Sequence, residues 1–342
     1  MGWSITENRY PVVRTILLTV NGLLFLLYLM VLARVVEQFG SSDWGRLYVL
    51  AAGCFATFVT TFAVTLNNHS VAACCTLFAL HPALQIWYRG ERSAGLFLAT
   101  GFFAGFTAVN ELPAACFAAA LLFLLLLRAP GRTLLLTIPA AAVPVAAALW
   151  TNYLAVGQLR PAYVEFGGPW YEFEGSYWKI DPGQVRHGID WAYQTESRAA
   201  YAFHVLIGHH GIFSLSPIFL LSVAGMTCGL LKGQGRTQLK MVALLTLLLS
   251  IMVIGFYIGG VNERNRNYGG WTSGLRWFFW LTPLWLLTML PAADWLSSRR
   301  WGRGLAYLLL GISVFSASYP AWNPWRHPWL YDFLQAYGLI NY

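Results

Sequence analysis

The sequence predicts an all-α protein, a polytopic transmembrane bundle of about ten helices. Hydrophobic residues make up 57% of the 342 residues and charged residues only 11%, against roughly 25% charged residues in soluble domains. Apolar runs long enough to cross about 30 Å of hydrocarbon recur from Thr15 to Tyr319. The hydrophobicity is therefore spread over many spans, and residues 1–342 are predicted to form a single membrane domain.

The predicted spans are the apolar runs between clusters of charged residues. In chain order they are 13–33, 47–65, 70–88, 94–109, 113–127, 133–154, 212–231, 241–259, 276–297 and 303–319. The runs 94–109 and 113–127 are shorter than the usual span of about 17 to 25 residues, so a re-entrant hairpin is the alternative there. Residues 156–211 are predicted to form a long extracytoplasmic loop.

Lysine and arginine occupy every second connection between these runs. The basic connections contain Arg34 and Arg46; Arg89 and Arg92; Arg128 and Arg132; Lys232, Arg236 and Lys240; and Arg299, Arg300 and Arg303. Cytoplasmic loops are enriched in basic residues, so these connections are assigned to the cytoplasm. The net charge of +8 then reflects topology, and nucleic acid is not an expected partner. Since the sequence is bacterial in style, we expect the inner (plasma) membrane, with the opposite face periplasmic.

Potentially reactive side chains gather in the connections assigned to the outer face. They are Asn67, Asn68, His69, Asn110, Glu111, His187, Asp190, Glu196, His204, His209, His210, Glu263, Arg264, Arg266 and Arg276. A membrane enzyme that acts on a lipid-linked substrate needs this arrangement. Acid or base groups and phosphate-binding cations lie at headgroup level, beside an apolar groove for the lipid tail.

Two short turns carry the first candidates. Residues 67–69 join two apolar runs with few residues, so the side chains of Asn67, Asn68 and His69 are held at the rim of the membrane. A polar turn with helix-capping asparagines is the alternative. Glu111 is the charged residue of a tight turn that ends at Pro113, and it is interpreted either as a helix cap or as a general base or ligand for a substrate hydroxyl.

Two further motifs are interpreted as substrate-binding. His209 and His210 suggest contact with a phosphate or a sugar hydroxyl, with interfacial packing as the alternative. We expect no metal, because a third ligand at a recognisable spacing is missing and adjacent residues diverge by about 100° on a helix. In the glycine-rich segment 262–276, Arg264, Arg266 and Arg276 are suited to bidentate binding of a phosphate, with a solvated loop as the alternative.

Three segments resemble the GT-C glycosyltransferases that use polyprenyl-phosphate-linked sugars, a group that includes protein O-mannosyltransferases and aminoarabinose transferases. They are TLNNHSVAACCTLFAL at 65–80, GFFAGFTAVNELPAACFAAALLFLLL at 101–126 and NYGGWTSGLRWFFWLTPLWLL at 267–287, together under a fifth of the chain. The resemblance implies an extracytoplasmic active site and inverting sugar transfer without a cofactor. It also implies that Glu111 and His69 line the acceptor or donor cavity, and that the three arginines neutralise the carrier phosphate.

The chain departs from this family at its first outer loop, which normally carries the catalytic Asp. Before Arg14 the sequence has only Glu7 as an acid, and the role is not carried onto it. We therefore expect that an N-terminal helix and loop are missing, so that the chain as given is truncated and inactive. The leading hypothesis is a membrane glycosyltransferase with a polyprenyl-phosphate-linked sugar and membrane lipids as partners. The alternatives are a lipid or glycolipid transporter (flippase) and a non-catalytic membrane scaffold.

Overall fold

The computed structural model describes residues 4–161, 173–176, 179, 187–231 and 237–342. All regular secondary structure in these residues is helical, which confirms the predicted all-α class. Five helices are long and apolar enough to cross a membrane, and they indicate a membrane protein. They are Arg9–Phe39, Asp43–Phe62, Asn68–Arg89, Pro130–Val156 and Leu239–Gly260. The larger number of about ten spans stays a prediction.

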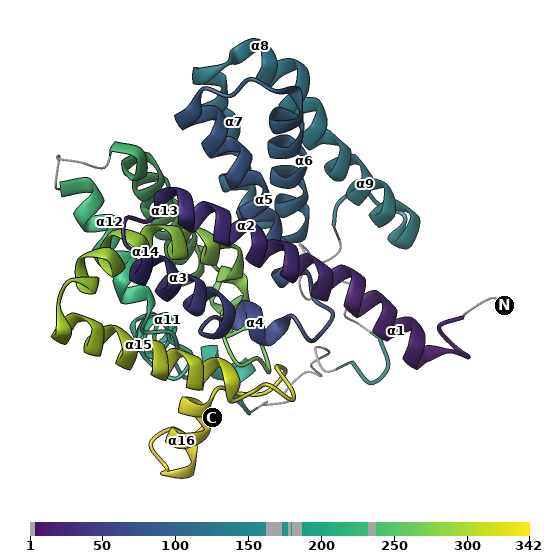
Figure 1. Ribbon diagram of the computed structural model, residues 1–342. Coiled ribbons are helices and arrows are strands. Elements are labelled where there is room, and N and C mark those ends of the chain that lie inside the picture. The colour runs from purple at the N-terminus through teal and green to yellow at the C-terminus, as the bar shows by residue number, and fades with distance from the viewer. Residues whose placement is uncertain (1–3, 162–172, 177–178, 180–186, 232–236) are drawn as a thin grey trace.

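The N-terminal half builds two groups of helices (Figure 1). The first is a long rod of α1 (Arg9–Leu17), η1 (Leu18–Gly22) and α2 (Leu23–Phe39), followed by α3 (Asp43–Phe55) and α4 (Phe58–Phe62). The second contains α5 (Asn68–Arg89), α6 (Ala94–Asn110), η2 (Leu112–Ala114), α7 (Ala115–Arg128), α8 (Pro130–Arg132), η3 (Thr133–Thr137) and α9 (Ile138–Val156). In the second group α6 packs between α5 and α9.

Glycines explain how closely α6 approaches its neighbours. A Cβ atom at Gly101 would lie 2.0 Å from the carbonyl oxygen of Thr137, and one at Gly105 would lie 2.4 Å from that of Ala141. Small residues let helix backbones come together where no hydrophobic effect drives helices to associate, as in a bilayer. The short apolar helix α6 is therefore held closely against η3 and α9, and the turn that joins it to α7 carries Glu111.

The C-terminal half is centred on α14 (Thr282–Ser297), which packs against α2, α3, α5, α12, α13 and α15. Its other helices are η6 (Ile189–Gln194), α10 (Arg198–Leu206), α11 (Ile212–Leu215), α12 (Phe219–Leu231), α13 (Thr237–Gly255), η7 (Phe256–Gly260), η8 (Glu263–Asn265), η9 (Arg276–Leu281), α15 (Arg300–Ser318) and α16 (Trp329–Ala336). The core formed around α14 therefore joins the two halves of the chain.

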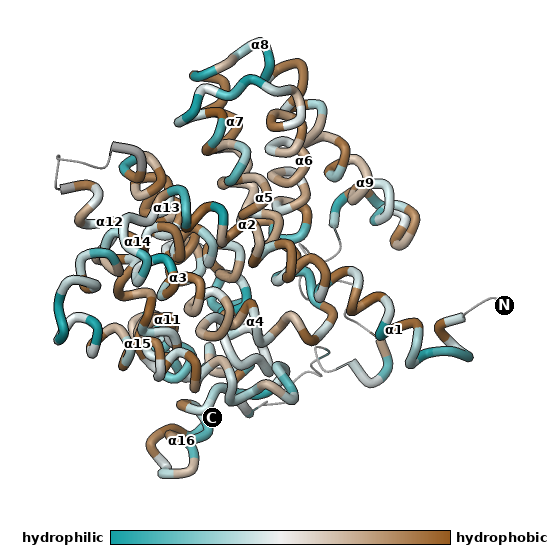
Figure 2. Tube along the Cα trace, in the orientation of Figure 1, coloured by the Kyte–Doolittle hydropathy of each residue, from teal (hydrophilic) through white to brown (hydrophobic). Residues whose placement is uncertain are grey.

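The outer faces of the long helices are strongly apolar. Figure 2 shows hydrophobic residues along α2 and α9, and only 17% of the most apolar window of each of the helices Arg9–Phe39 and Pro130–Val156 is buried inside the protein. Leu18 and Leu135 are among the exposed side chains. Soluble proteins rarely expose apolar surface of this extent, whereas lipid covers it readily.

The helices differ in detail from the predicted runs. The run 212–231 is interrupted at Ser216–Pro217, because proline has no backbone N–H and disfavours helical geometry at the residue before it. The run 47–65 is likewise divided at Ala56–Thr57. Within the predicted outer loop 156–211, the described residues form η6 and α10, so part of this loop is an ordered support for side chains.

Candidate functional site

Asn67 shapes the turn that leads into α5. It is the N-cap of that helix, and its side-chain oxygen accepts a hydrogen bond of 2.7 Å from the backbone N–H of Ser70. Its side-chain nitrogen donates to the carbonyl oxygens of Phe62 and Thr65, each at 2.8 Å. The polar atoms of Asn67 are thus used to hold the turn, and they place Asn68 and His69 on the first turn of α5.

The end of α6 brings Glu111 to the same place. Its backbone N–H continues the helix by donating to the carbonyl oxygen of Thr107 at 2.9 Å, and its own extended conformation then ends α6. The carboxylate oxygen Oε1 is in contact with Nδ1 of His69, and both side chains are buried. Asn68 donates from Nδ2 to the carbonyl oxygen of Asn110 at 2.5 Å and lies 3.4 Å from Oε1 of Glu111.

Arg276 supplies a positive charge to this region. It begins η9, which packs against α5, and its guanidinium lies 4.9 Å above the ring of Trp325. Burial lowers the pKa of Arg276, whereas the carboxylates of Glu111 and Asp190 raise it. Its buried Nε has no hydrogen-bond partner within the described residues. We call Asn68, His69, Glu111 and Arg276 the rim site, which combines a buried carboxylate with a cation that has donor capacity to spare.

Apolar surfaces adjoin the rim site. The ring of His69 meets Phe279 edge to face, with centroids 6.4 Å apart, and Phe279 lines a small cavity of about 30 Å³. A larger cavity of about 560 Å³ lies between α6, α7 and α9. Val109 and Leu112, which flank the Asn110–Glu111 turn in sequence, are among the residues that line it. The turn that carries Glu111 therefore borders space suited to an apolar chain, although Glu111 itself does not line that space.

The structure places two of the three predicted phosphate-binding arginines, Arg266 and Arg276, in different surroundings. Arg266 is buried away from the rim site, where its Nη2 donates to Glu263 at 2.7 Å and its guanidinium lies 5.8 Å from the ring centroid of Tyr201. Arg264 belongs to η8, but its side chain lies outside the described residues. Only Arg276, among the arginines whose side chains are described in this loop, shares a region with Glu111.

The two predicted histidines lie in a second group of residues. We call Glu196, His204, His209, His210, Tyr268 and Tyr342 the histidine cluster. His209 and His210 lie in the turn between α10 and α11, not on a helix, and their Nδ1 atoms are 2.6 Å apart. Nε2 of His209 lies 2.7 Å from the hydroxyl of Tyr342. Both rings are buried among side chains of the cluster, and their contact with a phosphate or a sugar hydroxyl stays a prediction.

The imidazoles of this cluster are neutral. Burial, with smaller contributions from His204 and His327, lowers the pKa of His209 to about 2. Burial also lowers the pKa of His210, with smaller contributions from the neighbouring histidines. Neutral imidazoles offer a lone pair as well as an N–H donor, which is the form that binds metals.

The sequence places Glu196 and His204 among the outer polar residues, but no spacing in it groups them with His209. Nothing in the sequence points to Tyr342, because it lies 133 residues after His209 and belongs to no motif. The density of His and Tyr in 201–210 was the available signal. Trp325, which supports Arg276, was also missed.

The rim site therefore unites residues from α5, the end of α6 and the start of η9, with a base, a cation and an apolar cavity in one region. Such a set can accept a proton and can hold an anionic group. No model of a protein family, no curated protein and no solved structure matches this chain.

Proposed function

We propose that this protein is a membrane glycosyltransferase that moves a sugar from a polyprenyl-phosphate carrier to an acceptor hydroxyl, with inversion, at the periplasmic face of a bacterial inner membrane. The observation that carries the proposal is the buried contact between Glu111 and His69, in a region where the charge of Arg276 acts on the same carboxylate. A buried carboxylate, an arginine and apolar space together match a substrate that has a hydroxyl, a phosphate and a lipid tail.

In this proposal Glu111 acts as the general base in place of the first-loop Asp that the resemblance implies, so the chain as given is proposed to be active and not inactive. Its carboxylate takes the proton of the acceptor hydroxyl while the hydroxyl oxygen bonds to the anomeric carbon of the sugar. The bond from that carbon to the phosphate oxygen breaks, and the phosphate leaves with the electron pair. His69, in contact with Oε1, and Asn68 hold the carboxylate in place. A positioned base of this kind contributes a factor of about 10² to 10⁴ to the rate.

Arg276 binds the carrier phosphate. The departing phosphate gains negative charge as the bond to the sugar breaks, so a nearby guanidinium stabilises the transition state more than the ground state. Guanidinium donors match phosphate oxygens in geometry, and the half-buried position of Arg276 strengthens the attraction. The ring of Trp325 keeps the guanidinium plane in place.

The isoprenoid tail occupies the cavity between α6, α7 and α9. Its volume of about 560 Å³ falls within the usual range of roughly 300 to 1,000 Å³ for ligand pockets. Alanine, valine and leucine side chains form most of its wall, while Thr151 and Asn152 are polar. An apolar chain is the ligand that such a wall favours.

The test uses the full chain, purified in detergent, with tritiated polyprenyl phosphate and with a panel of polyprenyl-phosphate sugars that carry the same label. We expect binding of the carrier and, with one of the sugars and an acceptor, release of free polyprenyl phosphate. Glu111→Gln keeps the size of the side chain and removes the base. This variant should bind polyprenyl phosphate but should not release it from the sugar donor. Glu174→Gln, which changes an exposed outer-loop carboxylate, is the matched control.

Two outcomes would change the assignment. Binding of the carrier by the unaltered chain, without release from any sugar donor, would favour a lipid transporter. Equal release by the unaltered chain and by Glu111→Gln would remove the carboxylate from the chemistry.

A further inference from the structure

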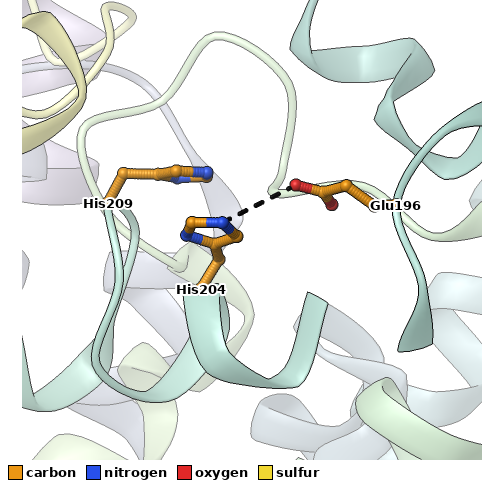
Figure 3. Close-up of side chains that lie close together, drawn as sticks. All are labelled: Glu196, His204 and His209. Carbon is orange, nitrogen blue, oxygen red and sulfur yellow. Dashed lines mark ion pairs between the residues drawn. The ribbon is translucent and has the colours of Figure 1, made fainter. Parts of the chain in front are cut away.

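Three metal-ligating side chains converge in the histidine cluster. Glu196 precedes α10, His204 lies near the end of α10, and His209 lies in the turn that follows (Figure 3). One ligand atom from each lies within 4.8 Å of the other two. Glu196 and His209, thirteen positions apart along the chain, therefore meet around one point together with His204.

The distance between His204 and Glu196 fits two metal–ligand bonds better than a hydrogen bond. Nε2 of His204 lies 3.9 Å from Oε1 of Glu196, beyond hydrogen-bonding distance. Zinc binds imidazole nitrogen at about 2.0 to 2.1 Å and carboxylate oxygen at about 2.0 to 2.2 Å, so tetrahedral ligands stand roughly 3.3 to 3.5 Å apart. A shift of about half an ångström brings these two atoms onto one ion.

His209 faces the same point. The hydroxyl of Tyr342 donates to Oε1 of Glu196 at 2.5 Å and lies 2.7 Å from Nε2 of His209, so both ligand atoms are directed at this hydroxyl. The rings of His204 and His209 are stacked, with centroids 3.9 Å apart. A rotation of one ring about its side-chain bonds lets both nitrogen lone pairs meet at an ion that displaces the hydroxyl.

We propose that Glu196, His204 and His209 bind a divalent transition-metal ion of the zinc type. Two imidazoles and one carboxylate are a known zinc ligand set, in which the fourth position holds water or another ligand. The buried Nδ1 of His204 has no hydrogen-bond partner among the described residues, so this ring is not fixed by another contact at that atom. This proposal replaces the expectation of no metal, which assumed that His209 and His210 lie on a helix and that a third ligand is missing.

Neighbouring groups support the ligands. Tyr268 donates to the other carboxylate oxygen of Glu196 at 2.7 Å and fixes its orientation. When Nε2 of His209 binds the ion, the ring proton sits on Nδ1 and is donated to Nδ1 of His210 at 2.6 Å. Partners of this kind hold ligating residues in the correct tautomer and orientation. By binding both His204 and His209, the ion would link α10 to the turn that follows it.

The test is a titration of the full chain, purified in detergent and stripped with a chelator, with zinc chloride in a calorimeter. We expect one ion per chain and a rise in the temperature of unfolding when zinc is added. His204→Ala and Glu196→Gln should each weaken binding more than about 100-fold, because loss of even an outer partner of a metal site costs roughly 10- to 100-fold. His187→Ala removes an exposed histidine of the same loop region and should bind like the unaltered chain.

Both variants are expected to fold, because His204 is only half-buried and because glutamine at position 196 still accepts hydrogen bonds. Cobalt chloride provides a second readout, since a four-coordinate cobalt site absorbs visible light strongly and His204→Ala should abolish that absorption. The proposal is overturned if the stripped chain takes up no zinc, or if His204→Ala and Glu196→Gln bind it as tightly as the unaltered chain.

Discussion

The rim site and the histidine cluster each contain a carboxylate, but the two carboxylates have different surroundings. Glu111 contacts the imidazole of His69 and interacts electrostatically with Arg276, and its turn borders a large apolar cavity. Glu196 is enclosed by the hydroxyls of Tyr268 and Tyr342. Burial and the charge of Glu196 raise the pKa of both tyrosines, so these hydroxyls keep their protons and act as donors to the carboxylate. A carboxylate that lies near a cation, in a turn that borders a cavity, is suited to proton transfer. A carboxylate enclosed by two hydroxyls is suited to holding a structure or an ion.

The largest expected effect separates the two carboxylates directly. Glu111→Gln should reduce sugar transfer by about 10² to 10⁴, the usual contribution of a general base. Glu196→Gln should reduce it less than about 10-fold, because Glu196 does not touch the substrate in this account. Release of labelled polyprenyl phosphate measures both rates. The comparison fails if the two variants lose activity to the same extent.

The second effect concerns the cation of the rim site. Arg276→Ala should weaken binding of polyprenyl phosphate by roughly 10- to 150-fold, because a hydrogen bond to a charged group contributes about 1.5 to 3 kcal/mol. Arg276→Lys should recover part of this loss, since the charge remains but the planar pair of donors does not. Equilibrium binding of the labelled carrier is the measurement. Arg299→Ala is the control, because Arg299 stacks on Trp295 in a connection assigned to the cytoplasm.

A third substitution acts on the histidine cluster alone. Tyr342→Phe removes the hydroxyl that joins Glu196 to His209. In the absence of metal, we expect the free energy of unfolding to fall by about 1 to 3 kcal/mol, the cost of leaving buried partners unsatisfied. Thermal unfolding in detergent reports this change, and the transfer rate should be unaltered. An unchanged unfolding temperature would show that the hydroxyl does not support the cluster.

The smallest effect compares two adjacent asparagines. Asn67 caps α5, so Asn67→Ala should lower the free energy of unfolding by about 1 kcal/mol. Asn68→Ala removes a donor near Glu111 and should lower the transfer rate with little change in stability. Unfolding temperature and transfer rate, measured on both variants, distinguish the two roles. The same profile for both would argue that the turn acts as a unit.

The rim site was largely predictable because of topology. Neighbouring helices joined by short turns return each outer connection to the same face, so His69 and Glu111 were expected on one side of the membrane. Their contact depends on how α5 packs against α6, and the sequence pattern does not determine this packing. The grouping of three arginines was expected from their spacing, yet the fold directs Arg266 toward Glu263 and Tyr201 and leaves Arg276 at the rim.

The histidine cluster could not be derived in the same way. It depends on α10, a helix inside a segment with no clear apolar period, and on Tyr342 from the other end of the C-terminal half. Contacts between residues so far apart in sequence are fixed by tertiary packing, not by local spacing. The division of 212–231 at Pro217 had a local signal in the proline, but hydropathy alone concealed it.

The most direct test of the central claim is chemical rescue of Glu111→Ala. We expect this variant to bind polyprenyl phosphate but to transfer sugar very slowly, and added formate to restore part of the rate in proportion to its concentration. Formate replaces the missing carboxylate in the space left by the side chain, which a purely structural role for Glu111 would not allow. A transfer rate equal to that of the unaltered chain, without formate, would contradict the account.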